Sequence, residues 1–296
     1  MCSPDDIPSP LLIRNQWCRT DQTSGIIVDY ETIKQQLEKG NRRANESLTF
    51  YAESDMADIV TLLLSYGVDE DSIRDAFIGC VGKNAYTTAK ILLEHHNSIL
   101  TNETQTALKI CCLRNFVKLF KLLLLYGADV KLDENVLLKN TLAYGHDWIE
   151  IIKLLVENGV DINCGLVIAS TYDNDDAVRF FLEQGADPNT NNGKALIKSI
   201  YSIKIVKLLL QAGADVHAKN NRALKRSIKS YQYDTTKLLI EHGADLLSLN
   251  DILINRSNSS VMLAELLLEQ NVDPLVIINS FNISTSLRGW ESPDSE

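Results

Sequence analysis

The sequence contains no apolar segment of the ~20 residues that a membrane-spanning helix requires. Its first thirty residues also lack the apolar core that is typical of a signal peptide. We therefore expect an intracellular, cytoplasmic protein that does not associate with a membrane.

Basic residues are fewer than acidic residues in this sequence. The chain has 29 Lys and Arg residues against 39 Asp and Glu residues, which gives a formal net charge of −10. Proteins that bind the phosphate backbone of nucleic acids need a surplus of Lys and Arg on one face. We therefore predict no nucleic-acid partner, and the net charge favours partners that are neutral or basic.

Paired metal ligands are absent as well. The six cysteines include no CxxC pair and no CxxC…HxxxH spacing, so nothing in the sequence gathers the four ligands that zinc requires. Cys80, Cys111 and Cys112 lie in apolar stretches, which favours buried thiols in a reducing cytosol. We predict no metal site.

No catalytic signature such as GxSxG or HExxH occurs. The segment FIGCVGKNAYT at 77–87 has the Gly-Lys step of a phosphate loop, but Phe77 and Asn84 stand where that loop needs Gly and Ser/Thr. His95 and His96 are adjacent, so on a helix they point apart, near a C-terminus whose dipole favours cations. We predict no catalytic residues and no cofactor. The remaining alternative is an enzyme whose acid–base cluster forms only in the folded protein.

What the sequence does contain is a repeat. Residues 119–131 are LFKLLLLYGADVK, residues 177–189 are AVRFFLEQGADPN and residues 205–217 are IVKLLLQAGADVH. A period between 20 and 50 residues is typical of a solenoid. The repeats end, at spacings of 26 to 32 residues, near Gly40, Gly67, His96, Gly127, Gly159, Gly185, Gly213, Gly243 and Asn271.

Each repeat predicts two helices. Ile205, Val206 and Leu209 belong to an apolar stripe at helical spacing, and Gly213 ends that helix because glycine readily takes left-handed dihedral angles. The Asp two residues later is expected to accept hydrogen bonds from nearby backbone amides. A shorter helix precedes each of these, at 44–53, 72–81, 103–113, 135–143, 165–171, 194–201, 222–230 and 250–256. Neither helix can bury its stripe alone, so we predict an all-α solenoid of about nine stacked helix-turn-helix repeats with short loops.

The segments GADVH, GVDIN and GADPN, each following an apolar helix, resemble the second helix and loop of ankyrin repeats over residues 29–275. The family's T-P-L-H opening is absent, and GKALIKSI and NRALKRSI stand in its place. The spacings are also shorter than the ~33 residues of that family, so we expect short loops. Such arrays are similar to ankyrin proteins of large DNA viruses, which would place a viral protein in the host cytoplasm.

The two ends differ from the repeats. Residues 1–28 contain Pro4, Pro8 and Pro10 and are predicted to be an extended segment. Residues 276–288 are predicted to form a C-terminal capping helix that covers the last repeat, and 289–296 a flexible tail. Some viral ankyrin proteins end in an F-box-like module, for which the ~22 residues after the last repeat are too few.

The resemblance implies a monomeric, non-enzymatic scaffold or adaptor that binds a partner protein through the concave face of loop tips and first helices. Two alternatives are an adaptor that delivers proteins to a ubiquitin ligase and a member of an expanded repeat family without an essential partner. The loops that keep most length carry our candidate partner-binding residues, which are Asn191, Asn192, Lys219, Asn220, Asn221 and Arg222.

Tyrosines recur near the end of the first helix or in the turn after it, at Tyr51, Tyr144, Tyr172, Tyr201 and Tyr231. If these positions are equivalent, they line up as an aromatic stripe along one edge, and tyrosine is a favoured binding anchor. The alternative is that each ring packs over its own turn and keeps its hydroxyl in water. Tyr172, Tyr201 and Tyr231 are added to the candidate partner-binding residues.

One segment suggests a modification. LVENGVDIN at 155–163 places a leucine eight residues before Asn163, which resembles ankyrin sites where a 2-oxoglutarate-dependent oxygenase hydroxylates asparagine. The alternative is that Asn163 completes the hydrogen bonds of its loop.

Overall fold

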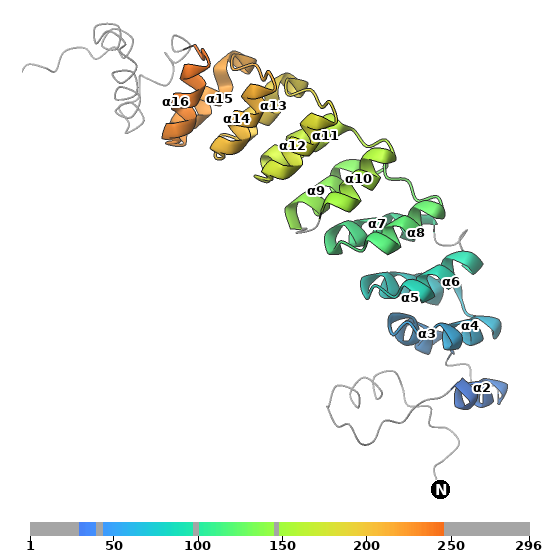
Figure 1. Ribbon diagram of the computed structural model, residues 1–296. Coiled ribbons are helices and arrows are strands. Elements are labelled where there is room, and N and C mark those ends of the chain that lie inside the picture. Colours follow the sequence, from blue (N-terminus) through green and yellow to red (C-terminus); the bar gives the residue numbers. More distant parts are fainter. Residues whose placement is uncertain (1–29, 40–43, 97–100, 145–147, 246–296) are drawn as a thin grey trace, which may run out of the picture. The chain divides into compact units, whose positions relative to one another are not determined.

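The computed structural model describes residues 30–39, 44–96, 101–144 and 148–245. These residues form fifteen α-helices and no strands (Figure 1). The chain divides into two compact units, Met1–Val160 and Asp161–Glu296, here called unit 1 and unit 2.

Unit 1 contains a layer of first helices and a layer of second helices. First helices pack on first helices, second helices on second helices, and the two members of a pair on each other. The first helices are α3 (Ala44–Glu53), α5 (Glu70–Gly82), α7 (Thr101–Arg114) and α9 (Glu134–Tyr144). The second helices are α2 (Tyr30–Glu38), α4 (Ala57–Ser65), α6 (Tyr86–His96), α8 (Val117–Leu125) and α10 (Ile149–Glu157).

Unit 2 repeats the same two layers in three pairs within its described residues. The first helices are α11 (Ile162–Thr171), α13 (Thr190–Lys198) and α15 (Ala218–Lys229). The second helices are α12 (Asp175–Glu183), α14 (Ile203–Gln211) and α16 (Tyr233–Glu241). The predicted alternation of two helices and a short loop is therefore confirmed in both units.

The apolar stripe of each second helix forms the core between the layers. In α14 the side chains of Ile205, Val206 and Leu209 are fully buried, as the spacing predicted. Burying one such side chain stabilises the fold by about 1.5 to 3 kcal/mol. No single pair contains enough of these residues for a core of its own, which explains why the pairs stack.

Glycine ends the second helices as predicted. Gly213 has φ +87° and donates its amide to the Leu210 carbonyl at 3.0 Å, while Ala214 donates to Leu209 at 2.9 Å. These two bonds satisfy carbonyls that the last helical turn leaves without partners. The same left-handed backbone occurs at Gly67, Gly127, Gly159, Gly185 and Gly243.

The predicted bounds of the first helices agree with the structure to within a few residues. α3 matches the predicted range, whereas α13 ends three residues before the predicted 201, because the Ser202 amide donates to the Ser199 carbonyl at 2.8 Å and turns the chain. Six expected features lie outside the described residues: the helix at 250–256, the repeat ends Gly40 and Asn271, and the segments 1–28, 276–288 and 289–296.

The thiols predicted to be buried are buried. Burial raises the pKa of Cys112 to about 12, and it also raises the pKa values of Cys80 and Cys111, so all three side chains are neutral thiols. Within the described residues, no group of three His, Cys, Asp or Glu side chains is placed to hold a metal ion. None of the helices described is long and apolar enough to cross a membrane.

Candidate partner-binding surface

The first residues of α13 form a left-handed loop turn that precedes the regular part of the helix. Asn191, Asn192 and Gly193 have φ values of +52°, +57° and +67°, between Asn189 and the regular part of the helix. Asparagine tolerates this region better than most residues and glycine adopts it freely. The loop is therefore short and compact, as its length predicted.

The loop turn at the start of α15 has the same conformation one repeat later. Lys219, Asn220 and Asn221 have φ values of +50°, +58° and +54°. Left-handed angles in residues other than glycine cost about 1 to 3 kcal/mol each, so surrounding contacts must hold this turn in place. Those contacts come from the neighbouring loop.

Asparagine side chains join each loop of unit 2 to the next. Asn163 Oδ1 accepts the Asp187 amide at 2.8 Å, and Asn189 Oδ1 accepts the Asp215 amide at 2.7 Å. Asn189 Nδ2 also donates to the Gly213 carbonyl at 3.0 Å. These bonds fix the position of one loop relative to its neighbour, so a partner meets a preorganised surface.

The Asp of each loop accepts backbone amides, as predicted. Asp187 Oδ1 accepts the Asn189 amide at 2.9 Å, and Asp215 Oδ1 accepts the His217 amide at 2.8 Å. A carboxylate that accepts such a bond closes the loop locally. These Asp side chains therefore have a structural role in unit 2.

Asn221 differs from the expectation of an exposed loop tip. Its side chain is 4% exposed, its Oδ1 accepts the Asp245 amide at 2.9 Å, and His217 Nδ1 lies 3.2 Å from the same oxygen. His217 occupies the position that Asn163 and Asn189 hold in earlier repeats, so Asn221 takes over the bond to the next loop. Asn221 was predicted to be an exposed partner-binding residue, and the expected exposure was wrong. The sequence position of Asn221 did not reveal that it replaces the loop asparagine of earlier repeats as the acceptor.

The other loop candidates are accessible. Asn191, Asn192, Lys219, Asn220 and Arg222 are all exposed. They come from two neighbouring loops of identical backbone conformation, so the structure brings them to one edge of unit 2.

The three candidate tyrosines are also exposed. Tyr172, Tyr201 and Tyr231 are 44%, 60% and 55% exposed. Tyr201 is held in place, since its hydroxyl lies 3.2 Å from Ser230 Oγ and the Arg226 guanidinium lies 5.8 Å from its ring centroid. The hydrogen bond with Ser230 is the largest cause of the lowered pKa of Tyr201, and a hydrogen bond with Arg226 is the second largest.

These tyrosines do not occupy equivalent positions, however. Tyr172 is the residue that ends α11, whereas Tyr231 is the left-handed residue after α15, which corresponds to Asp173. Tyr51 is only 6% exposed, and burial raises its pKa. The side chain of Tyr144 lies outside the described residues. An aligned stripe of exposed rings that includes Tyr51 is therefore ruled out, and the Tyr51 ring packs within the fold instead.

Asn163 already has a structural function. It lies in the first turn of α11, where Asp161 Oδ1 accepts its amide at 2.8 Å, and its own Oδ1 binds the next loop. This supports the alternative that Asn163 completes the loop hydrogen bonds. Its hydroxylation stays a prediction.

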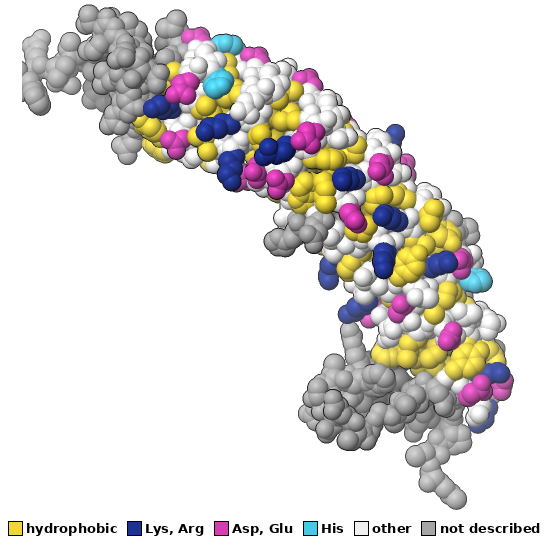
Figure 2. All heavy atoms as spheres, in the orientation of Figure 1, with side chains coloured by type: hydrophobic (Ala, Val, Ile, Leu, Met, Phe, Trp, Pro, Cys, Tyr) yellow, Lys and Arg dark blue, Asp and Glu magenta, His cyan; other side chains and the backbone are white. Residues whose placement is uncertain are grey.

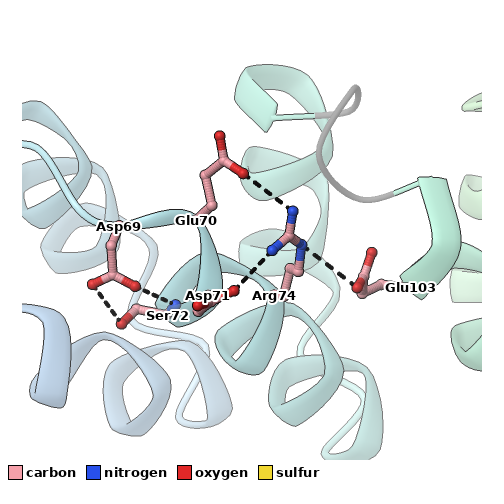
Figure 3. A network of polar contacts seen from close by, with 6 residues as sticks. All are labelled: Asp69, Glu70, Asp71, Ser72, Arg74 and Glu103. Atoms are coloured by element: carbon pink, nitrogen blue, oxygen red, sulfur yellow. Dashed lines mark hydrogen bonds and ion pairs between the residues drawn. The ribbon is translucent and has the colours of Figure 1, made fainter.

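In unit 1 charged side chains form a network at the start of α5 (Figure 3). Arg74 Nη1 lies 2.8 Å from Asp71 Oδ1 and Arg74 Nη2 lies 3.1 Å from Glu70 Oε2, all within α5. Arg74 Nε also reaches Glu103 Oε1 of α7 at 3.7 Å. Arg74 thus neutralises acidic residues at the start of α5 and links two first helices.

The carboxylate that begins α5 is a helix cap. Asp69 accepts the Ser72 amide at 2.8 Å and the Ser72 hydroxyl at 3.0 Å (Figure 3). The backbone bond from Ser72 is the largest cause of the lowered pKa of Asp69. A capping carboxylate of this kind stabilises the helix N-terminus.

Comparisons with known proteins agree on one family. A family model described as ankyrin repeats in three copies matches residues 48–134 and again residues 166–250, more than half of the chain. The crystal structure of the human ASB11 ankyrin repeat domain is similar, with a TM-score of 0.52 and 21% sequence identity. That similarity covers 67% of this chain and 98% of the ASB11 domain, and at this identity it concerns the fold alone. No curated protein sequence matches the chain.

Proposed function

Since this chain belongs to the ankyrin-repeat family, whose repeats are generally protein–protein interaction modules, we propose that it is a non-enzymatic scaffold that binds a partner protein. The surface for that partner consists of the loop tips and first helices of unit 2. Its loop residues are Asn191, Asn192, Lys219, Asn220 and Arg222, and Tyr201 lies on a neighbouring turn.

The preorganised loops of unit 2 carry this proposal. The turns at 191–193 and 219–221 have one conformation, and asparagine side chains tie each to its neighbour. A surface that is ordered before binding avoids the cost of ordering loops on association. Exposed polar side chains on such a scaffold are available to a partner rather than used in the fold.

The test is affinity capture with the full chain, followed by mass spectrometry and measurement of direct binding with each purified candidate. The variant combines Asn192→Ala, Lys219→Ala and Arg222→Ala, which changes exposed side chains and leaves the bonds of Asn189 and Asn221 intact. A candidate that binds the natural chain directly and binds the variant at least about tenfold more weakly supports the proposal.

The matched control carries Lys204→Ala and Lys207→Ala on α14, where both residues are exposed on a second helix. Binding that this control weakens as much as the loop variant contradicts the proposed surface. Direct binding of ligase subunits would identify the ubiquitin-ligase adaptor. The absence of any direct binder would favour a family member without an essential partner.

A further inference from the structure

The first helices α13 and α15, with the loop turns that begin them, carry positive charge only. Neither element contains Asp or Glu. Their charged residues are Lys194, Lys198, Lys219, Arg222, Lys225, Arg226 and Lys229, here called the basic face. This is unexpected in a chain whose net charge is −10.

The cations of α15 lie on one side of that helix. They follow one another at intervals of three, one and three residues, at Arg222, Lys225, Arg226 and Lys229. Such spacing places side chains on a single helical face. The residues between them are buried and form the opposite face, at Ala223, Leu224, Ser227 and Ile228.

The cations of α13 continue this surface. α13 packs directly beside α15, and Arg226 Nη1 donates to the Ile197 carbonyl of α13 at 3.2 Å. Lys194 and Lys198 lie 28 residues before Arg222 and Arg226, so they occupy the same positions one repeat earlier. The two helices therefore present their cations side by side.

Within the described part of the chain, no carboxylate forms an ion pair with any residue of the basic face, whereas in unit 1 the cations Arg74, Lys90 and Lys109 are each paired with a carboxylate. Two loop carboxylates that precede these helices, Asp187 and Asp215, accept backbone amides instead. Elsewhere, as on the face in Figure 2, side chains of both signs are interspersed. Like charges on adjacent turns repel one another, so an anionic partner would relieve this repulsion.

We propose that the basic face binds an acidic segment of a partner polypeptide, an inference that rests on the proposed scaffold function and specifies its partner. Carboxylates of such a segment can accept two parallel bonds from Arg222 and single bonds from the lysines. The whole-chain charge favoured neutral or basic partners, but the charge that a partner meets is local. A polypeptide is favoured over a nucleic acid because ankyrin repeats are generally protein–protein interaction modules.

The probe is a fluorescein-labelled peptide of ten glutamates, titrated with the full chain while anisotropy is measured. The peptide is expected to bind, and raising the salt concentration from about 0.1 M to about 1 M, which shortens the Debye length from ~10 to ~3 Å, is expected to abolish binding. A variant with Lys225→Glu and Lys229→Glu is expected to bind at least about tenfold more weakly.

The control variant, Lys204→Glu with Lys207→Glu, makes the same change in net charge on second helix α14. It is expected to weaken binding by less than about threefold, because its charges lie away from the basic face. Far-UV circular dichroism and thermal melting establish that both variants are folded. Equal losses in the two variants, or no binding of the glutamate peptide by the natural chain, overturn the proposal.

A ten-nucleotide oligothymidylate is titrated in parallel. Tighter binding of this oligonucleotide than of the peptide, lost in the Lys225→Glu, Lys229→Glu variant, would assign the basic face to nucleic acid and overturn the proposal. The scaffold function is tested separately. A partner from affinity capture that still binds this variant, while the loop variant loses it, leaves the scaffold in place and overturns only the acidic-segment inference.

Discussion

Units 1 and 2 have the same two-layer architecture but connect their repeats with different chemistry. In unit 1 several of the connections come from charged side chains. Asp55 Oδ1 accepts the Thr88 amide at 2.8 Å, Arg74 lies 3.7 Å from Glu103, and Lys109 Nζ lies 2.8 Å from Asp133 Oδ2. These charged side chains of unit 1 are occupied within the fold.

In unit 2 neutral asparagine amides connect successive loops. Asn163, Asn189 and Asn221 each accept a backbone amide from the following loop. These links use no ionic groups, and among the described residues the cations of α13 and α15 form no ion pair with a carboxylate, although Arg226 also bonds the Ile197 carbonyl. The comparison shows that the type of link between repeats matters for binding. Side chains that are not needed for these links remain available to a partner.

The largest effect is expected when an asparagine link is removed. Asn221→Ala removes the side-chain oxygen that accepts the Asp245 amide. It also places alanine, which tolerates left-handed dihedral angles less well than asparagine, at φ +54°. We expect unit 2 to lose about 2 to 3 kcal/mol of stability. Urea unfolding followed by circular dichroism measures this loss.

Asn221→Gly separates the two contributions, because glycine accepts the left-handed angle, as Gly193 does in the preceding loop, but provides no acceptor. It is expected to lose less stability than Asn221→Ala. Equal stability of Asn221→Ala and the natural chain would show that the asparagine link does not hold the loops together.

A smaller effect is expected from removing charge in each unit. Arg74→Met in unit 1 breaks three ionic contacts and is expected to cost about 1 kcal/mol. Lys225→Met in unit 2 breaks none and is expected to change stability by less than about 0.5 kcal/mol. The two variants are compared by urea unfolding at one ionic strength, and similar costs would contradict the contrast drawn between the units.

A gain in stability is expected at a turn where the units differ. The left-handed residue between paired helices is Asp55, Asn84 or Asn115 in unit 1, but it is Tyr231 before α16. Tyrosine tolerates φ +55° less well than asparagine, so Tyr231→Asn is expected to stabilise unit 2 by about 0.5 to 1 kcal/mol. Thermal melting measures the gain, and Tyr172→Asn, at a position with negative φ, is the control.

The smallest effect concerns pH. The hydrogen bond from Lys109 is the largest cause of the lowered pKa of Asp133. A carboxyl group whose pKa is lower in the folded state stabilises the fold above its unfolded pKa, and this stabilisation is lost as pH falls through the folded pKa. Asp133→Asn is therefore expected to flatten the decline of the melting temperature below pH 4 slightly, while Asp129→Asn, which has no such ion pair, serves as the comparison. An unchanged pH profile in Asp133→Asn would contradict this contribution.

Much of the fold was predictable because it depends on local spacing. The apolar stripe around Leu209 and the glycine at 213 set the end of one helix and the start of a loop through contacts within a few residues. The bounds of α3 and the buried state of Cys80 followed from the same short-range patterns.

The surface was less predictable because it depends on the neighbouring repeat. Asn221 is buried because Asp245, 24 residues away, donates to it, and because His217 replaces the asparagine of earlier loops. The mismatch between Tyr172 and Tyr231 arises from one residue in the turn, which a spacing of about thirty residues does not reveal. The basic face required knowing that α13 and α15 are adjacent.

The asparagine links of unit 2 all have the same orientation along the chain. In each link the acceptor belongs to one repeat and the donor amide, at Asp187, Asp215 or Asp245, to the repeat that follows. These amides lie in loops and donate to the asparagine of the previous repeat, so their exchange with deuterium reports the docking of one repeat on the previous one. Unit 2 therefore contains three internal sensors of stepwise opening, which can distinguish fraying that begins at one end from loss of the whole stack.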